Sequence, residues 1–115
     1  MDKIPGNVPA LRDSAKVQAF VVAQHHAGAT AAAICAGPIA LARFGLLAGK
    51  QATCFPGFED QLTGAILQTD AVVVDGDVVT SRGVGTALAF SLVLVDRLAG
   101  TDTARTLATR MLVER

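Results

Sequence analysis

Between residues 13 and 28, apolar side chains recur at the spacing of a helix. Asp13 or Ser14 caps the start of this predicted helix, because either side chain can accept a hydrogen bond from a free backbone amide. Gly28 is a good helix stop. The next run, Ala29–Ile34, is apolar without alternation, which is typical of a strand buried on both faces of a parallel sheet.

A second helix is expected from Pro38 to about Phe44, because the first helical turn tolerates a proline. Farther on, residues 85–98 form an apolar stretch that predicts a helix, and its nearly uniform apolarity indicates a buried layer. Alternation of helices with apolar strands predicts a layered α/β fold. The remaining expected elements are a strand over 51–54, a helical turn over 59–63, strands over 71–74 and 78–80 flanking the hairpin signal Asp75-Gly76-Asp77, and a final helix with the stripe Ala104, Leu107, Ala108 and Met111.

The charge pattern argues against two classes of partner. The chain has 10 acidic and 10 basic residues, and the basic ones do not cluster, so nothing draws it to nucleic acid or an anionic membrane. A membrane-spanning helix needs roughly 20 continuous apolar residues. The longest uncharged stretch, 17–42, is interrupted by glutamines, histidines, glycines and a proline, and no signal peptide is visible. We therefore expect a chain of the cytoplasm.

The apolar content is high for 115 residues. Mean hydropathy is +0.46 and 51% of residues are hydrophobic. A chain of this size leaves much of its surface in water, so it would expose more apolar area than a monomer tolerates. Either a partner covers that area or part of the domain is absent.

Cys35 lies at a predicted strand-to-helix turn, with small residues two positions before and after it, Ala33 and Gly37. This is the spacing of a nucleophile elbow with cysteine in place of serine. The positive end of the following helix favours thiolate over thiol, and the Ala36 amide could stabilise an oxyanion. The alternative from spacing alone is an ordinary buried cysteine.

Other candidate residues have weaker signals. Cys54 is either a buried strand thiol or a resolving thiol for an oxidised Cys35. Two cysteines make neither a disulfide framework nor a metal-ligand spacing, so they indicate a reducing compartment. His25 and His26 are helix neighbours that point in different directions, so a metal site is not expected. Arg82 either holds an anion such as a substrate carboxylate or makes a surface salt bridge.

Two segments resemble the ThiJ/PfpI superfamily, more narrowly the clade of the Parkinsonism-associated protein deglycase and its bacterial homologues. Residues 33–38, Ala-Ile-Cys-Ala-Gly-Pro, are similar to the clade's cysteine elbow. Residues 74–86 are similar to its hairpin and the following Thr-Ser-Arg-Gly-Pro-Gly-Thr segment, with Val84 replacing the proline. The resemblance covers almost the whole chain and implies a flavodoxin-like three-layer α/β/α sandwich.

The departures from the family pattern matter for function. Ala36 stands where PfpI-type proteases have histidine, and Phe55 where some members have another, so no Cys–His pair is available. The family domain begins with strands and helices before a Pro-Gly-Gly turn, and this chain starts about where that turn ends. The resemblance therefore implies that residues 1–115 are a partial domain. The part it lacks would carry the family's proton-transfer glutamate, a glycine amide of the oxyanion pocket and much of the dimer interface.

The resemblance implies a cofactor-independent and metal-independent enzyme of the glyoxalase III or protein deglycase type, acting on methylglyoxal, glyoxal or their adducts. Cys35 would be the nucleophile and Ala36 the oxyanion donor, with Arg82, Gly37 and Phe55 contacting substrate. The expected partner is a second copy or a completing N-terminal half. The alternatives are a redox-sensing or chaperone-like stress protein with an oxidisable cysteine, and an inactive truncated domain.

Overall fold

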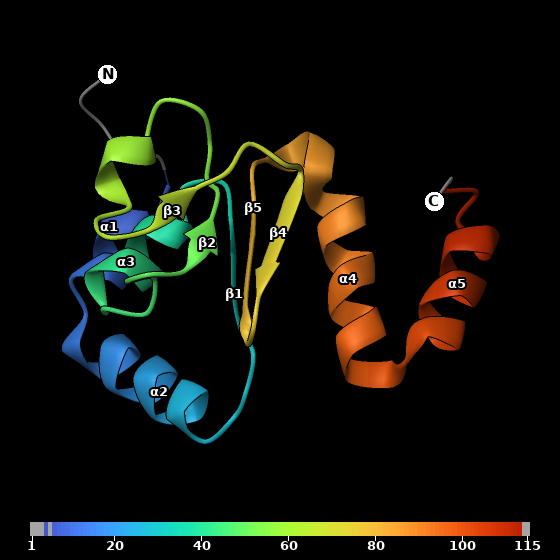
Figure 1. The fold of residues 1–115 in the computed structure, drawn as a ribbon, viewed down its shortest axis with the longest axis horizontal. Helices are drawn as coiled ribbons and strands as arrows, with labels where there is room; N and C mark the ends of the chain where they lie inside the picture. The colour runs from blue at the N-terminus through green and yellow to red at the C-terminus, as the bar shows by residue number, and fades with distance from the viewer. Residues whose placement is uncertain (1–3, 5, 114–115) are drawn as a thin grey trace.

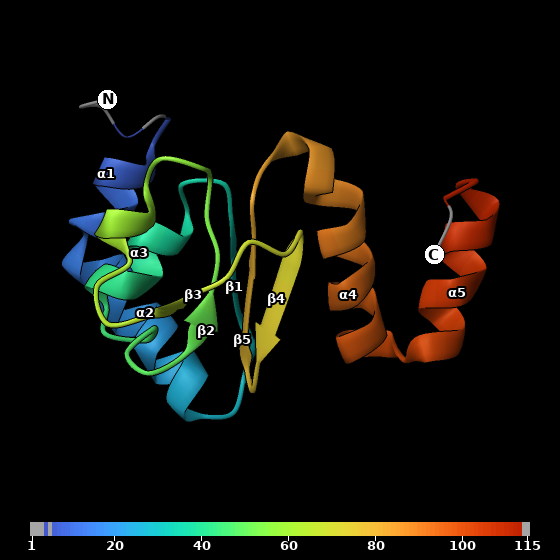
Figure 2. The ribbon, with the colours of Figure 1, turned by 45° about the horizontal axis from the view of Figure 1, so that its top comes forward.

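The computed structural model describes residue 4 and residues 6–113. A small sheet lies between two helical layers, with α1, α2 and α3 on one face and α4 on the other, and α5 packs against α4 (Figures 1 and 2). The described helices are α1 (Val8–Arg12), α2 (Ala15–His26), α3 (Pro38–Arg43), α4 (Ala87–Ala99) and α5 (Thr101–Arg110); the strands are β1 (Ala31–Ile34), β2 (Gln51–Ala52), β3 (Ile66–Leu67), β4 (Val72–Asp75) and β5 (Val78–Ser81); single 3-10 turns span Glu59–Gln61 and Val84–Thr86.

The main sheet has the strand order β1-β5-β4. β1 runs parallel to β5, with Ala31 opposite Val78 and Ile34 opposite Ser81. β4 and β5 form the antiparallel hairpin that the Asp-Gly-Asp signal predicts, with Gly76 at a positive φ of 59° in its turn. A second, two-stranded parallel sheet pairs β2 with β3. β3 was not predicted from the sequence.

Local sequence signals explain where the first helices begin and end. The Ser14 hydroxyl accepts a hydrogen bond from the Val17 amide at 3.2 Å, so Ser14 is the cap of α2. Gly28 follows the end of α2 with a φ of +95°, a conformation that glycine adopts without a steric cost. α3 begins at Pro38, as predicted. These three features confirm the predicted helix–strand–helix order around β1.

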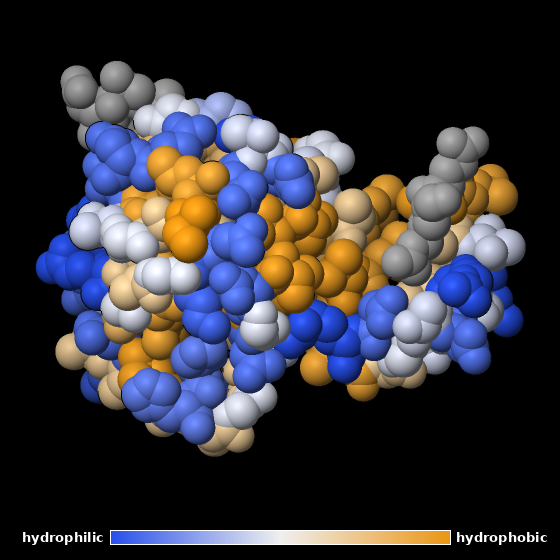
Figure 3. All heavy atoms as spheres, viewed as in Figure 1, coloured by the Kyte–Doolittle hydropathy of each residue, from blue (hydrophilic) through white to orange (hydrophobic). Residues whose placement is uncertain are grey.

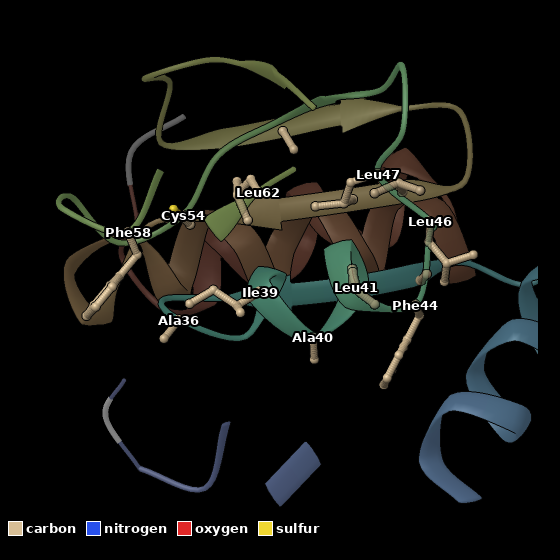
Figure 4. Close-up of a cluster of buried hydrophobic side chains, with 13 residues drawn as sticks. Ala36, Ile39, Ala40, Leu41, Phe44, Leu46, Leu47, Cys54, Phe58 and Leu62 are labelled. Carbon is tan, nitrogen blue, oxygen red and sulfur yellow. The ribbon is translucent and has the colours of Figure 1, made fainter. Parts of the chain in front are cut away.

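The hydrophobic core lies between α3 and the strands, and the chain that follows α3 closes it (Figure 4). Ile39 and Leu41 project from α3, and Leu47 is completely buried just beyond it. Phe58 and Leu62 seal the same cluster. Burying a leucine, isoleucine or phenylalanine side chain contributes about 1.5–3 kcal/mol, so this cluster is the main source of stability.

Two expectations about burial are wrong. Ala32, in the middle of β1, is exposed, and a pocket of about 750 Å³ separates it from Leu94 and Leu98 of α4. Leu92 is the one fully buried side chain of α4, whereas Leu88 and Leu98 are 55% and 79% exposed. Figure 3 shows apolar atoms at the surface over the sheet and α4. The described chain therefore leaves part of the apolar surface of these elements exposed.

None of the described helices combines the length and apolarity required to cross a membrane.

Candidate active site

Cys35 occupies the turn between β1 and α3 in a strained backbone conformation. Its φ is +64°, in the left-handed region that non-glycine residues rarely adopt. Two hydrogen bonds hold it there: the Cys35 amide donates to the Ser81 carbonyl at 3.1 Å, and the Phe55 amide donates to the Cys35 carbonyl at 2.8 Å. Such strain costs on the order of 1–3 kcal/mol and persists where surrounding structure enforces it. The nucleophile-elbow geometry expected from residues 33–38 is present.

Gly37 closes this turn, and its neighbours leave no room for a side chain. Its amide donates to the Ile34 carbonyl at 2.9 Å. A Cβ at position 37 would lie 2.9 Å from that carbonyl oxygen and 3.3 Å from the Cβ of Ala33. The requirement is for space, because the φ of Gly37 is an ordinary −53°. The small residues on either side of Cys35 are therefore a steric condition of the elbow.

Cys35 is partly exposed and lines a pocket of about 510 Å³. The walls come from α1, α2, β1 and α3, and they are almost entirely apolar. None of the described residues that line the pocket carries a carboxylate or an imidazole. Among the described residues the Ala36 amide makes no backbone hydrogen bond, and Ala36 itself is 2% exposed. The pocket supplies a thiol and a donor but no acid–base group.

Cys54 has the properties of an inert thiol. It is 1% exposed, and its Sγ lies 3.4 Å from the carbonyl oxygen of Phe55. Burial, and then the nearby Glu59 carboxylate, raise the pKa of Cys54 to about 11. A thiol of that pKa is protonated near neutral pH and is a poor nucleophile. Its role as a resolving thiol stays a prediction.

The Arg82 side chain contacts the segment after β2, whose Phe55 amide donates to the Cys35 carbonyl. Its Nε donates to the Cys54 carbonyl at 3.0 Å and its Nη2 to the Glu59 carboxylate at 3.1 Å. Its Nη1 lies 3.4 Å from the Thr69 carbonyl. Of the two sequence-based interpretations of Arg82, the structure displays the ion pair. A substrate carboxylate would compete with Glu59 for the guanidinium, so substrate binding by Arg82 stays a prediction.

The Glu59 carboxylate is held in its charged form. Hydrogen bonds from its own backbone amide and from the Gly57 amide, the latter at 2.8 Å, lower the pKa of Glu59, and the charge of Arg82 adds to the effect. Because the carboxylate is already bonded on both sides, we do not assign it the role of a general base. It anchors Arg82.

Phe55 contributes its backbone to the elbow, but it is not among the described residues that line the pocket of Cys35. The ring is 40% exposed, and a Cβ built on Gly83 would lie 3.6 Å from it. The family resemblance implied that Phe55 contacts substrate, and this role stays a prediction. The sequence did not indicate the hydrogen bond from the Phe55 amide to Cys35, or the acceptor role of the Ser81 carbonyl. Neither backbone contact depends on side-chain identity, so neither leaves a sequence signal.

The described residues contain no group of three or more histidine, cysteine, aspartate or glutamate side chains that could hold a metal ion. The rings of His25 and His26 have centroids 6.2 Å apart and are tilted with respect to each other.

A layered α/β domain with a cysteine fixed in a left-handed turn between a parallel strand and a helix defines the class of cysteine-elbow proteins. Comparison with known families agrees with this class. The model of the DJ-1/PfpI family matches residues 4–97, and the chain belongs to that family.

Individual relatives support the same assignment. Drosophila melanogaster protein dj-1beta is 37% identical over 110 residues, which cover 94% of this chain and 59% of the relative. A protein of Caenorhabditis elegans named glutathione-independent glyoxalase DJR-1.2 is 37% identical over 73% of this chain and 46% of its own. Pseudomonas putida isonitrile hydratase is 34% identical over 89% of this chain and 46% of its own.

The crystal structure of Drosophila DJ-1beta superimposes with a TM-score of 0.88 at 34% sequence identity, covering 99% of this chain and 67% of that chain. The fold is therefore that of the flavodoxin-like DJ-1/PfpI domains. The chain spans about three fifths or less of the curated relatives named above.

Proposed function

We propose that the chain carries the nucleophile of a cofactor-independent cysteine enzyme that converts small dicarbonyl compounds, methylglyoxal or glyoxal and their early protein adducts, into hydroxy acids. The single observation that carries the proposal is the strained Cys35 beside an unused Ala36 amide, at the rim of a pocket. The family relationship and the relative named as a glyoxalase support this substrate class.

The reaction divides into three steps. The Cys35 thiolate attacks the aldehyde carbon, a C–S bond forms, and the carbonyl electron pair moves to oxygen to give a hemithioacetal. The Ala36 amide stabilises the oxyanion as it forms. A base then moves the proton from this carbon to its neighbour, which gives a thioester of the hydroxy acid. Water cleaves the C–S bond, releasing lactate from methylglyoxal and restoring the thiol, with no net oxidation.

The proton-transfer step needs a base that the described pocket does not contain. The lining residues of the described chain are apolar apart from backbone groups and Cys35 itself. We therefore propose that a second segment, either a completing part of the domain or a partner chain, brings the base to the pocket. Turnover depends on that assembly, whereas addition of the thiol to an aldehyde does not.

The test is lactate formation from methylglyoxal. The chain is produced alone and together with the part of Drosophila DJ-1beta that it does not match, as wild type, Cys35→Ala and Cys54→Ala. We expect lactate from the assembly, a loss of at least about a thousandfold in Cys35→Ala, and retained activity in Cys54→Ala because that thiol is buried.

Lactate formation that survives Cys35→Ala would contradict the proposal, as would a folded assembly that makes none. An aliphatic isonitrile is assayed in parallel because one relative bears the name of an isonitrile hydratase. Formamide production without lactate would assign the same cysteine to that chemistry instead.

A second candidate function is oxidation sensing, and the lack of an acid–base group among the described pocket residues favours it. A partly exposed thiol can be oxidised by two equivalents of peroxide to a sulfinate, releasing water, without a protein base. Intact mass after peroxide treatment distinguishes the two functions. A stable two-oxygen adduct at Cys35, with no dicarbonyl turnover by the assembly, would favour the sensor.

A further inference from the structure

The pocket beside Cys35 is much larger than the reacting part of a small dicarbonyl compound. Its volume of about 510 Å³ lies within the range of pockets that hold drug-sized ligands, roughly 300–1,000 Å³. Methylglyoxal carries only a methyl group beside its two carbonyl groups. When Cys35 has added to the aldehyde carbon, most of this volume is therefore left for the group attached to the second carbonyl.

The walls of this pocket range from buried to exposed. Leu41 in α3 and Phe44 just after it are 5% and 7% exposed. Val17 and Val21 of α2 are half-buried, and Leu11 of α1 is 43% exposed. Figures 1 and 2 show these three helices on the same face of the sheet. A substituent that contacts Leu41 and Phe44 is therefore shielded from water, whereas one that contacts only Leu11 stays partly hydrated.

The pocket selects by polarity. Apart from Cys35, every described residue that lines it has an apolar side chain or none. The hollow of about 240 Å³ between α1, α3 and the first 3-10 turn differs, because Arg12, Arg43 and Gln61 line it. A hydroxylated group in the Cys35 pocket would lose hydration without gaining a side-chain hydrogen bond, which is unfavourable. An alkyl group there gains free energy from leaving water.

We propose that Cys35 favours 2-oxoaldehydes that carry an alkyl chain of several carbons, seated in this apolar pocket, over methylglyoxal and over sugar-derived dicarbonyl compounds. This inference rests on the proposed function, because it takes Cys35 as the nucleophile, and it specifies the substrate within the dicarbonyl class. The bond-forming step is unchanged: a C–S bond forms at the aldehyde carbon, and the thiol proton ends on the former carbonyl oxygen. The alkyl chain takes no part in the chemistry, so it contributes through binding.

The experiment measures reversible addition of methylglyoxal, butylglyoxal and hexylglyoxal to Cys35 of the folded chain. The readout is the protection that each compound gives against iodoacetamide, and N-acetylcysteine serves as the reference thiol. Each fully buried methylene should tighten binding about fourfold. Because part of the pocket wall is exposed, we expect at least about tenfold from methyl to butyl after correction for the reference thiol.

A hydroxylated compound provides the matched ligand. 3-Deoxyglucosone has the carbon skeleton of butylglyoxal with three hydroxyl groups, and it should bind no better than methylglyoxal because those hydroxyls lose water in the pocket. Recovery of the free thiol on dilution separates the addition to Cys35 from slower modification of arginine.

A matched pair of variants tests the location. Val21→Thr and Val22→Thr make the same change at neighbouring half-buried positions of α2, both packed against the core. Val21 lines the pocket, and Val22 is not among the described residues that do. Val21→Thr should reduce the preference for butyl over methyl by about threefold or more, and Val22→Thr should preserve it, with both variants folded by circular dichroism.

Equal corrected binding of methylglyoxal and butylglyoxal, or a preference that Val21→Thr leaves intact, would overturn the inference. The series is repeated as kcat/KM for hydroxy-acid formation by the assembly with the Drosophila segment. A preference that disappears in the assembly would mean that the segment fills the pocket and would also overturn it. Lactate formation with no chain-length preference contradicts this inference alone. A preference in binding without any hydroxy acid from the folded assembly contradicts the proposed function instead.

Discussion

α3 and α4 are both predominantly apolar helices on opposite faces of one sheet, yet the fold uses them differently. In α3, Pro38, Ile39, Ala40 and Leu41 are all buried, because β1, α1 and the chain that follows surround the helix. In α4, twice as long and similarly apolar, only Leu92 is buried. The apolar content of a helix therefore indicates how much of its surface other elements are expected to bury. The described chain provides that cover for α3 and only partly for α4 and the edge of β1.

The largest expected difference is between two leucine-to-alanine substitutions, one in α3 and one in α4. Leu41→Ala removes a side chain that is 5% exposed and should lower the free energy of unfolding by about 2–5 kcal/mol. Leu98→Ala, at 79% exposure, should change it by about 0.5 kcal/mol or less. Urea unfolding followed by far-ultraviolet circular dichroism measures both, since the chain has no Trp or Tyr to report fluorescence. Equal losses would show that α4 is covered in solution and would break the comparison.

The next effect concerns the turn that joins β1 to α3. Gly37→Ala forces a Cβ within 2.9 Å of the Ile34 carbonyl oxygen, so the turn must open. We expect a loss of about 1–3 kcal/mol, which outweighs the better helix propensity of alanine. Gly85→Ala is the control, because a Cβ there meets nothing within 4 Å. If Gly37→Ala is as stable as Gly85→Ala, the tight turn is not a steric requirement.

A pH effect of intermediate size comes from the buried Cys54. Its folded-state pKa of about 11 lies above the ordinary value of 9.0, so the unfolded chain loses this proton at lower pH than the folded chain. The resulting stabilisation is complete below pH 9 and is lost as the pH rises toward and through 11, by about 2 kcal/mol. Unfolding of wild type and Cys54→Ala between pH 8 and 11 measures it. Parallel pH profiles for the two proteins would mean that the thiol is not buried.

The smallest effect on stability is expected from Arg82→Gln, which removes the ion pair with Glu59 and the hydrogen bond to the Cys54 carbonyl. Because the pair is partly exposed, the loss should be about 1 kcal/mol or less. The loop that holds the Cys35 carbonyl should loosen more than the fold does, so the rate at which iodoacetamide modifies Cys35 should change. Arg82→Lys keeps the charge but not the planar contacts. If iodoacetamide modifies Cys35 in Arg82→Gln at the wild-type rate, Arg82 does not hold the elbow in place.

Local chemistry predicted much of this architecture. The Ser14 cap, the break at Gly28, the start of α3 at Pro38 and the hairpin at Gly76 each follow from a few adjacent residues. β3 was missed because two residues are too few for a periodic pattern and its pairing with β2 is set by distant contacts. Burial of α4 was wrongly expected. Apolar side chains favour burial, but they become buried only where other parts of the chain pack against them.

The candidate site divides in the same way. Cys35 and Gly37 were predictable because the turn needs small neighbours in a fixed order. The partners of Arg82 and the hydrogen bonds from the Phe55 amide and to the Ser81 carbonyl were not predictable, because they join residues that are 13 to 46 positions apart in the chain, and two of them involve only backbone atoms.

The most direct test of the account compares the two cysteines in one native sample. The chain is treated with iodoacetamide near pH 7.5, and modification of each cysteine is followed by peptide mass mapping, with a urea-unfolded sample as the control. We predict that the partly exposed Cys35 is modified at least about a hundredfold faster than the buried Cys54, and that both react alike when unfolded. Equal native rates, or faster modification of Cys54, would contradict the claim that Cys35 is the reactive centre of this chain.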